Sequence, residues 1–233
     1  MRVLLERDGE RCIYCRGETA DSVKDAHVYP QALRENDYTL PKGVECDACD
    51  QFHGSIESAL LEHNRIGLFA VIHAIPGKRG RPRRRLRNVE RDAEGNLRVM
   101  GVAKSARAID GRLEIEYGDP ASVDDRRFRR ALGHIALNYV AFRLGGRVAL
   151  EATFDEIREF VRRGRGSAWP YVQFQYDDAR IARPLGLRLI ETDTRRIVQI
   201  RTYVDDFYVD PSSSDGYLIE WAQRILPRGW LSP

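Results

Sequence analysis

The sequence of 233 residues has no long hydrophobic run and no export signal that we can identify. A transmembrane helix needs about 18 or more consecutive apolar residues, and no such run occurs. The opening stretch MRVLLERDGER holds too short an apolar segment for a signal peptide. With 42% hydrophobic and 31% charged residues, the composition is that of an ordinary globular protein. We therefore expect a cytoplasmic protein without a membrane partner, in a compartment where thiols stay reduced.

Cysteine is scarce, so its placement is informative. The four cysteines form two CxxC turns, CIYC at residues 12–15 and CDAC at residues 46–49. Each CxxC turn lets two thiolates converge on one ion, and two turns complete a tetrahedral site of the structural zinc type. In a reducing compartment this pairing favours a metal over disulfide bonds. The sequence thus predicts a structural Zn²⁺ without an open coordination position, bound by Cys12, Cys15, Cys46 and Cys49.

Lysine is scarce as well, and the basic residues are mostly arginines. The net charge is only +3, but the stretch GKRGRPRRRLR at residues 77–87 concentrates seven basic residues. Its KRGRPRR segment resembles an AT-hook, in which Arg-Gly-Arg-Pro lies in the narrow minor groove of DNA. General phosphate contact and a merely solvated loop are the alternatives. The candidate nucleic-acid-binding residues are Lys78, Arg79, Arg81, Arg83, Arg84 and Arg85.

The hydrophobic pattern predicts an α+β fold that includes an antiparallel sheet. Helical spacing occurs over residues 55–75, with a weak point at Gly67, and over residues 124–146, 153–164 and 215–226. Strand-like segments form a small meander over residues 84–118, and four more follow at residues 171–178, 186–192, 196–204 and 206–210.

The residues between and after the two CxxC turns carry a family resemblance. His27 opens the segment HVYP between the turns, and the second turn runs into the helical segment FHGSIESALLE. This order resembles the HNH endonuclease family, in its subset with two CxxC zinc knuckles around the catalytic hairpin. The resemblance covers roughly residues 8–65. It implies a ββα-metal fold that binds one divalent cation, Mg²⁺ or Mn²⁺, and hydrolyses phosphodiester bonds in DNA.

The resemblance also implies roles for individual residues. His27 matches the histidine that activates water, a role that suits its near-neutral intrinsic pKa. Asp50 follows the last cysteine, at the position of a metal ligand, and offers a hard oxygen donor. The ligand position before the histidine holds Ala26, which cannot ligate. Asp25 shares a strand face with His27, so we expect it to substitute, and His53 would join the metal or contact phosphate.

Weaker candidates complete this set. Asn36 is the candidate for the middle asparagine of the family, and Glu57 is a further possible ligand. Each of these residues also has a plain structural reading, such as a helix cap for Asp50 or a polar strand position for His27. The histidines at positions 63, 73 and 134 fall in helical stretches, where we expect core or surface roles.

We divide the chain into an HNH-like domain with the four-cysteine zinc site (1–75), a basic loop entering the sheet (76–95), and an α+β accessory domain that contacts DNA (96–233). The segment RALGHIALNYVAFRLGG, followed by FDEIREFVRRG, resembles the partner domain found behind such nucleases. The favoured hypothesis is an endonuclease acting on double-stranded DNA. The alternatives are a decayed zinc module that binds nucleic acid without cleaving it, and a sensor or assembly domain. The oligomeric state stays open, a homodimer included.

Overall fold

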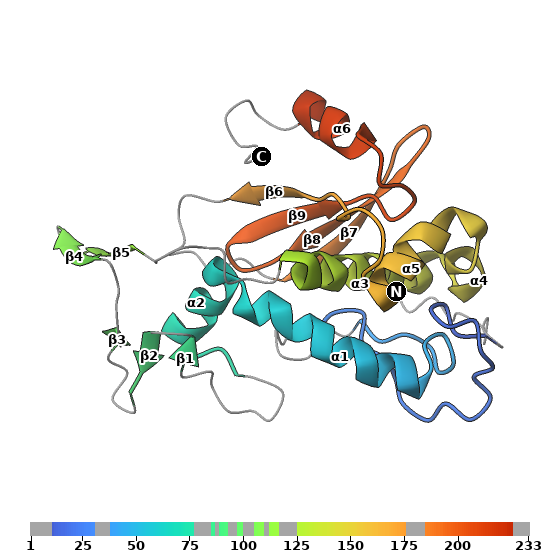
Figure 1. The fold of residues 1–233 in the computed structure, drawn as a ribbon, viewed down its shortest axis with the longest axis horizontal. Helices are drawn as coiled ribbons and strands as arrows, with labels where there is room; N and C mark the ends of the chain where they lie inside the picture. Colours follow the sequence, from blue (N-terminus) through green and yellow to red (C-terminus); the bar gives the residue numbers. More distant parts are fainter. Residues whose placement is uncertain are drawn as a thin grey trace.

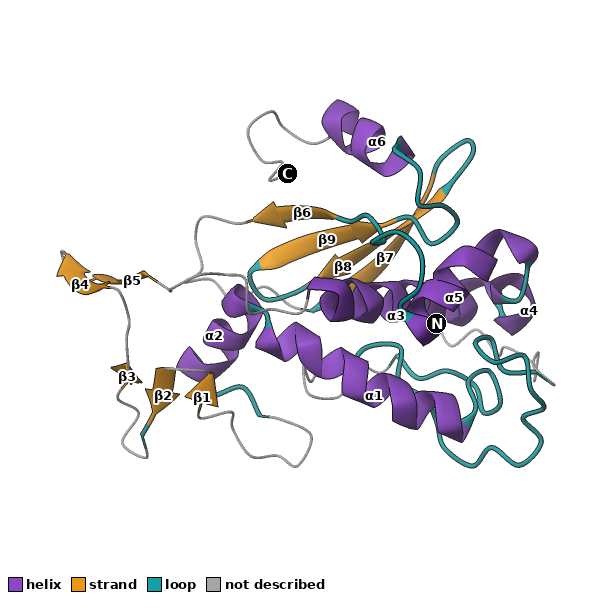
Figure 2. Cartoon of the chain, in the orientation of Figure 1, coloured by secondary structure: helices purple, strands orange, loops and turns teal. Residues whose placement is uncertain are grey.

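The computed structural model describes residues 11–30, 38–76, 85–86, 89–92, 97–99, 105–109, 112–116, 125–175 and 185–225. These residues form a mixed α and β structure (Figures 1 and 2). Its helices are α1 (Asp47–Glu62), α2 (Asn64–Ile72), α3 (Asp125–Leu144), α4 (Gly146–Ala149), α5 (Asp155–Arg163) and α6 (Tyr217–Ile225), with a 3₁₀ turn at Ala152–Phe154. Its strands are β1 (Arg85–Leu86), β2 (Val89–Arg91), β3 (Leu97–Val99), β4 (Ser105–Ile109), β5 (Arg112–Glu116), β6 (Val172–Gln175), β7 (Gly186–Glu191), β8 (Arg196–Arg201) and β9 (Asp205–Val209).

The strands confirm the expected antiparallel sheet. A four-stranded sheet has the order β6-β9-β8-β7, and each neighbouring pair is antiparallel. The predicted meander consists of two smaller pieces, β1-β2-β3 and the β4-β5 hairpin. The described chain is therefore α+β, as the hydrophobic pattern predicts.

Both faces of the four-stranded sheet are covered, α3 lying on one face and α6 on the other (Figure 1). The alternation of strand side chains produces these two faces. On the α3 side, Ile200 and Phe207 belong to the main core. On the α6 side, Tyr208 packs with Trp221 of α6 in a smaller cluster. Helix α3 is consequently the central layer, between the sheet and α1.

The first helix differs from the prediction in its start and in its break. It begins at Asp47, directly after Cys46, because the CDAC turn itself forms its first turn. Acidic residues there interact favourably with the positive end of the helix dipole, a signal that apolar spacing does not carry. The break lies at His63, whose ψ of 127° ends α1, whereas Gly67 lies inside α2.

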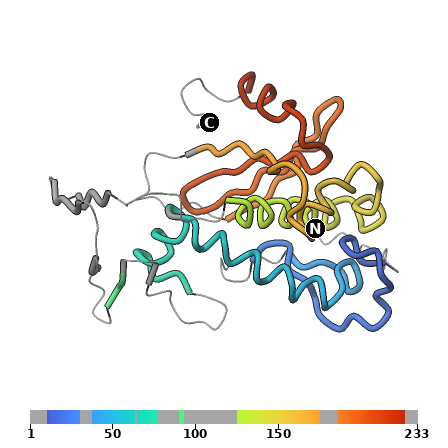
Figure 3. Tube along the Cα trace, in the orientation of Figure 1, coloured from blue at the N-terminus to red at the C-terminus, as the bar shows by residue number. Residues whose placement is uncertain are grey.

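The N-terminal region and the C-terminal sheet share one hydrophobic core. The buried residues of this core run from Cys12 to Val209. The first CxxC turn lies beside α4 and α5 (Figure 3), where Arg158 of α5 donates a hydrogen bond to the carbonyl of Ile13 at 2.5 Å. The division of the chain near residues 75 and 96 stays a prediction, and the core extends across it.

The contact between α3 and α5 leads to a test of this packing. A Cβ on Gly133 would lie 3.0 Å from Val161 Cγ2, so we expect Gly133→Val to lower the free energy of unfolding by about 1–3 kcal/mol. Gly54 of α1 has open space around its Cα, so Gly54→Ala should raise the same free energy by up to about 1 kcal/mol. Urea denaturation measures both changes. Equal stability of the two variants would contradict the close α3–α5 contact.

Candidate metal centre and adjoining cavity

The four cysteines come together as one group of ligands. Their Sγ atoms all lie within 4.8 Å of one another, and Cys15 Sγ lies 3.7 Å from Cys46 Sγ. A tetrahedral zinc site with Zn–S bonds of about 2.3 Å has sulfur–sulfur edges of about 3.8 Å. None of the four cysteines is in a disulfide bond. The arrangement therefore fits the predicted structural Zn²⁺.

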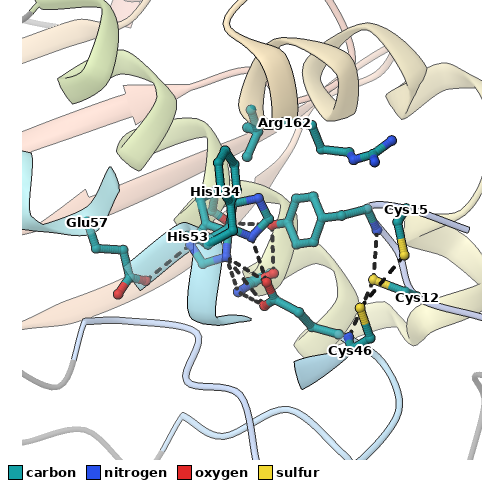
Figure 4. Close-up of polar contacts among 12 residues, drawn as sticks. Cys12, Cys15, Cys46, His53, Glu57, His134 and Arg162 are labelled. Carbon is teal, nitrogen blue, oxygen red and sulfur yellow. Dashed lines mark hydrogen bonds and ion pairs between the residues drawn. The ribbon is translucent and has the colours of Figure 1, made fainter. Parts of the chain in front are cut away.

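Backbone N–H groups support the sulfurs of this group (Figure 4). The N–H groups of Tyr14 and Cys46 each donate to Cys12 Sγ at 3.4 Å. The hydrogen bond from Cys49, together with these backbone donors, lowers the pKa of Cys12 to about 5 despite its burial. A thiol that ionises readily is a good metal ligand.

A short hairpin precedes the second CxxC turn. Val28 N–H donates to the Tyr38 carbonyl at 2.9 Å, and Leu40 N–H donates to the Ala26 carbonyl at 2.8 Å. His27 is thereby paired with Thr39 across an antiparallel bridge. Ala26 and Val28 are buried in the core, so residues 25 and 27 lie on the opposite face of this strand. The alanine therefore occupies a core position and not a position on the face of His27.

A cavity of about 850 Å³ lies between this hairpin and α1. We call it the hairpin–helix cavity. The hairpin side contributes Asp25 and His27, and α1 contributes Asp50 and Glu57, which are seven residues apart and therefore on one helix face. The complete lining consists of Lys24, Asp25, His27, Pro30, Asp50, Gln51, Gly54, Glu57, Ser58 and Leu61.

The described residues contain a second group of candidate ligands, between α1 and α3. Glu45, His53 and His134 are buried, and one ligand atom of each lies within 4.8 Å of the others. We call these three residues the Glu45 cluster. His53 Nδ1 lies 2.6 Å from Glu45 Oε1, and His134 Nε2 lies 3.3 Å from both oxygens of Glu45. The cluster joins the second CxxC turn, α1 and α3 (Figure 4).

Two further residues, Tyr14 and Asn138, add hydrogen bonds around the cluster. Asn138, one turn after His134, donates from Nδ2 to Glu45 Oε2 at 3.2 Å. Its Oδ1 accepts the Tyr14 hydroxyl at 2.8 Å, and this hydroxyl also lies 3.1 Å from the carbonyl of His134. The first CxxC turn, which contains Tyr14, is thus tied to the same point of α3.

The charges of the Glu45 cluster follow from its contacts. Burial alone would raise the pKa of Glu45, but the charge of His134 and hydrogen bonds from both histidines lower it to about 2. Burial alone would lower the pKa of His134, but Glu45 and Glu57 raise it to about 10. Burial and the neighbouring charge of His134 lower the pKa of His53 to about 4. At neutral pH the cluster therefore holds a carboxylate, an imidazolium and a neutral imidazole.

Glu57 belongs both to this network and to the hairpin–helix cavity. His134 Nδ1 lies 3.1 Å from Glu57 Oε1, and the Glu57 side chain is 17% exposed. The ring of His134 therefore bridges the buried carboxylate of Glu45 and a carboxylate that lines the cavity. Figure 4 shows Glu57 beside the neighbouring rings of His53 and His134.

The structure brings some of the predicted site residues together and separates others. Asp25, His27 and Asp50 line one cavity, together with Glu57. His53 is not among the lining residues and lies in the Glu45 cluster. Asn36 and five of the predicted DNA-binding residues lie outside the described residues, and the structure describes only the backbone of Arg85, in β1. Those five are Lys78, Arg79, Arg81, Arg83 and Arg84.

Sequence reasoning missed the roles of Glu45 and His134. His134 falls in the apolar stripe of α3, where we expected a core or surface residue; it is buried but ion-paired. The available signal is the pair His134 and Asn138, two polar side chains four residues apart within that stripe. Nothing in the sequence indicates that Glu45, 89 residues earlier, is their partner.

No protein-family model matches the chain, and neither a curated protein nor a solved structure matches it. The site is therefore interpreted from its own geometry. None of the helices in the described part of the chain has the length and apolarity that crossing a membrane requires.

Loss of one metal ligand tests the four-cysteine site. We expect Cys46→Ser to lower the zinc content well below one ion per chain and to unfold the N-terminal region, because metal binding there is folding free energy. Metal analysis and circular dichroism of the purified variant measure both effects. A variant that keeps its zinc and its fold would contradict the predicted metal centre.

The pH dependence of stability tests the charge of His134. The folded protein holds this proton more tightly than the unfolded chain, so its contribution is complete below about pH 6.5 and disappears as the pH rises through about 10. His134→Gln should lower the free energy of unfolding by about 3 kcal/mol near neutral pH. Above neutral pH, the difference in the free energy of unfolding between the variant and the wild type should shrink by up to about 1.4 kcal/mol per pH unit.

Urea unfolding of the wild type and the variant, near pH 7 and near pH 9, measures this difference. In the wild type, Glu45 and His53 keep their charge states over the interval, because their pKa values lie at about 2 and about 4. The titration of the cysteines is common to both proteins and cancels. A difference that grows with pH would contradict an imidazolium at position 134.

Proposed function

We propose that this chain is a metal-dependent endonuclease that hydrolyses phosphodiester bonds in DNA at the hairpin–helix cavity. The observation that carries this proposal is the lining of the cavity, where one histidine meets three carboxylates. His27 comes from the hairpin, and the carboxylates come from both walls as Asp25, Asp50 and Glu57. The cavity lies directly beside the candidate zinc site, because Asp50 follows Cys49 in the chain.

The donor set fits a hard divalent cation. Mg²⁺ and Mn²⁺ prefer carboxylate oxygens and are commonly held by one or two carboxylates, with water and substrate phosphate completing the shell. Burial, followed by the nearby charges of Glu45 and Glu57, raises the pKa of Asp50. A cation would relieve this repulsion between like charges. When bound, it would polarise the phosphoryl group and stabilise the leaving oxygen.

The side chains around the cation have distinct tasks in this proposal. His27 accepts a proton from the attacking water as the general base. Lys24 lines the same cavity and supplies a positive charge for a phosphate oxygen. Its backbone N–H donates to Asp47 Oδ1 at 3.1 Å, which anchors this segment to the first turn of α1. The arginine-rich stretch after α2 would add further phosphate contacts.

Cleavage of supercoiled plasmid by the zinc-loaded protein, with Mg²⁺ or Mn²⁺, tests the proposal. We expect nicking or linearisation that EDTA abolishes. His27→Ala should lower the rate by about 10²–10⁴-fold, which is the usual contribution of a general base. Zinc content should stay unchanged, because His27 is not one of the four cysteine ligands, and DNA affinity should stay nearly unchanged, because a general base acts on the attacking water.

His73→Ala is the matched control. This histidine follows the last residue of α2, is exposed, and does not line the cavity, so the variant should cleave at the wild-type rate. A wild type that binds plasmid on a gel but never cleaves it would support the alternative, a zinc module that only binds nucleic acid. Cleavage that survives His27→Ala would remove His27 as the base.

A further inference from the structure

We propose that His134 of α3 is a positioning residue that fixes the Glu57 carboxylate in the hairpin–helix cavity as a cation ligand. A residue from the C-terminal part of the chain thereby completes a site whose other members come from residues 24–61. The inference rests on the proposed function, because it assigns a role within that same site.

The first step is the geometry of the His134 ring. Its Nε2 lies 3.3 Å from each oxygen of Glu45, and its Nδ1 lies 3.1 Å from Glu57 Oε1. His134 thus faces a carboxylate at each of its ring nitrogens, and its contact with Glu57 is an ion pair. Its side chain is 3% exposed, so water does not compete for the Glu57 contact from the His134 side. The contact therefore sets where the Glu57 carboxylate can lie.

The second step is the anchoring of Glu45. This residue directly precedes the cysteine ligand Cys46, and its carboxylate also contacts His53 at 2.6 Å and Asn138 at 3.2 Å. One end of the chain of contacts is thus fixed to the metal centre and the other end reaches the cavity. The order is Cys46, Glu45, His134 and Glu57.

The third step is that the same turn of α3 reaches the opposite wall of the cavity. Asn138 Nδ2 lies 3.5 Å from the carbonyl oxygen of His27, the proposed base. Four residues separate His134 from Asn138, so both project from one face of α3. Helix α3 therefore contacts α1 through Glu57 and the hairpin through His27. It fixes the positions of the proposed base and the proposed ligand relative to each other.

This arrangement follows a common rule of metal sites. Mutation of a residue that hydrogen-bonds a metal ligand and orients it typically lowers metal affinity or activity by about 10–100-fold. Glu57 has a long and flexible side chain, and the His134 contact restricts its rotamers.

A competing reading places a second transition metal in the Glu45 cluster itself, because three ligand atoms lie within 4.8 Å of one another. The 2.6 Å separation of His53 Nδ1 and Glu45 Oε1 is a hydrogen-bond distance. Ligands on one tetrahedral ion with bonds of about 2.0–2.1 Å lie about 3.4 Å apart. The distances therefore favour a network of hydrogen bonds and ion pairs.

Binding of Mn²⁺ to the full-length, zinc-loaded protein tests the inference, measured by calorimetry. We expect His134→Gln to weaken Mn²⁺ binding by about tenfold or more, like Glu57→Gln. The double variant should bind no more weakly than Glu57→Gln alone, because one interaction cannot be lost twice. His63→Gln is the matched control: this ring also lies between α1 and α3, stacked on Phe128 at 4.6 Å, and it does not line the cavity.

A second variant covers the case in which His134→Gln fails to fold. Glu57→Asp keeps the charge but shortens the side chain by one methylene, so the carboxylate loses its contact with His134 while α1 keeps its surface. We expect Glu57→Asp to weaken Mn²⁺ binding by a similar factor. Wild-type affinity in this variant would overturn the inference.

The remaining outcomes separate the inference from the proposed function. Wild-type Mn²⁺ affinity in His134→Gln, or additive losses in the double variant, would overturn the positioning role and leave the nuclease proposal intact. A second zinc ion per chain that disappears in His134→Gln would also overturn it, in favour of a metal in the Glu45 cluster. A wild type that neither binds Mn²⁺ nor cleaves DNA would overturn the nuclease proposal and the inference together.

Discussion

The rest of the structure depends on one buried carboxylate. Glu45 is 2% exposed, and its charge is matched by the imidazolium of His134 and a hydrogen bond from His53. A buried charge without a partner is very unfavourable. Glu45 is therefore buried favourably only when the segments that carry His53 and His134 pack against it. The second CxxC turn, α1 and α3 are joined at this point. The four-cysteine group, the hairpin–helix cavity and α3 are therefore joined through Glu45 and its partners.

Helix α3 extends this unit to the sheet. One side of α3 contacts α1, and the other side packs on β7, β8 and β9. Its buried residues run almost without interruption from Phe128 to Ala141, which is typical of a helix covered on several sides. Tyr29 adds a direct tie, because its hydroxyl donates to the carbonyl of Arg201 in β8 at 3.0 Å. The sheet thus supports the hairpin wall as well as the helix.

Local signals predict the parts of this protein that are local in sequence. The two CxxC turns, the amphipathic α5 and the alternating strands follow from spacing alone, and so does the position of Asp25 and His27 on one strand face. The Glu45 cluster does not, because its members are separated by up to 89 residues and no periodicity links them. The burial of His53 was missed for the same reason. An i,i+3 spacing from Asp50 places it about one turn away, but only the packing of α3 decides which side of α1 is buried.

The hairpin strand that carries His27 has a second consequence. Asp25 and His27 face the cavity, whereas Ala26 and Val28 are buried in the core. In an extended strand a shift of pairing by one residue exchanges the two faces. A single inserted or deleted residue that shifts this pairing would therefore turn Asp25 and His27 towards the core, and Ala26 and Val28 towards the cavity.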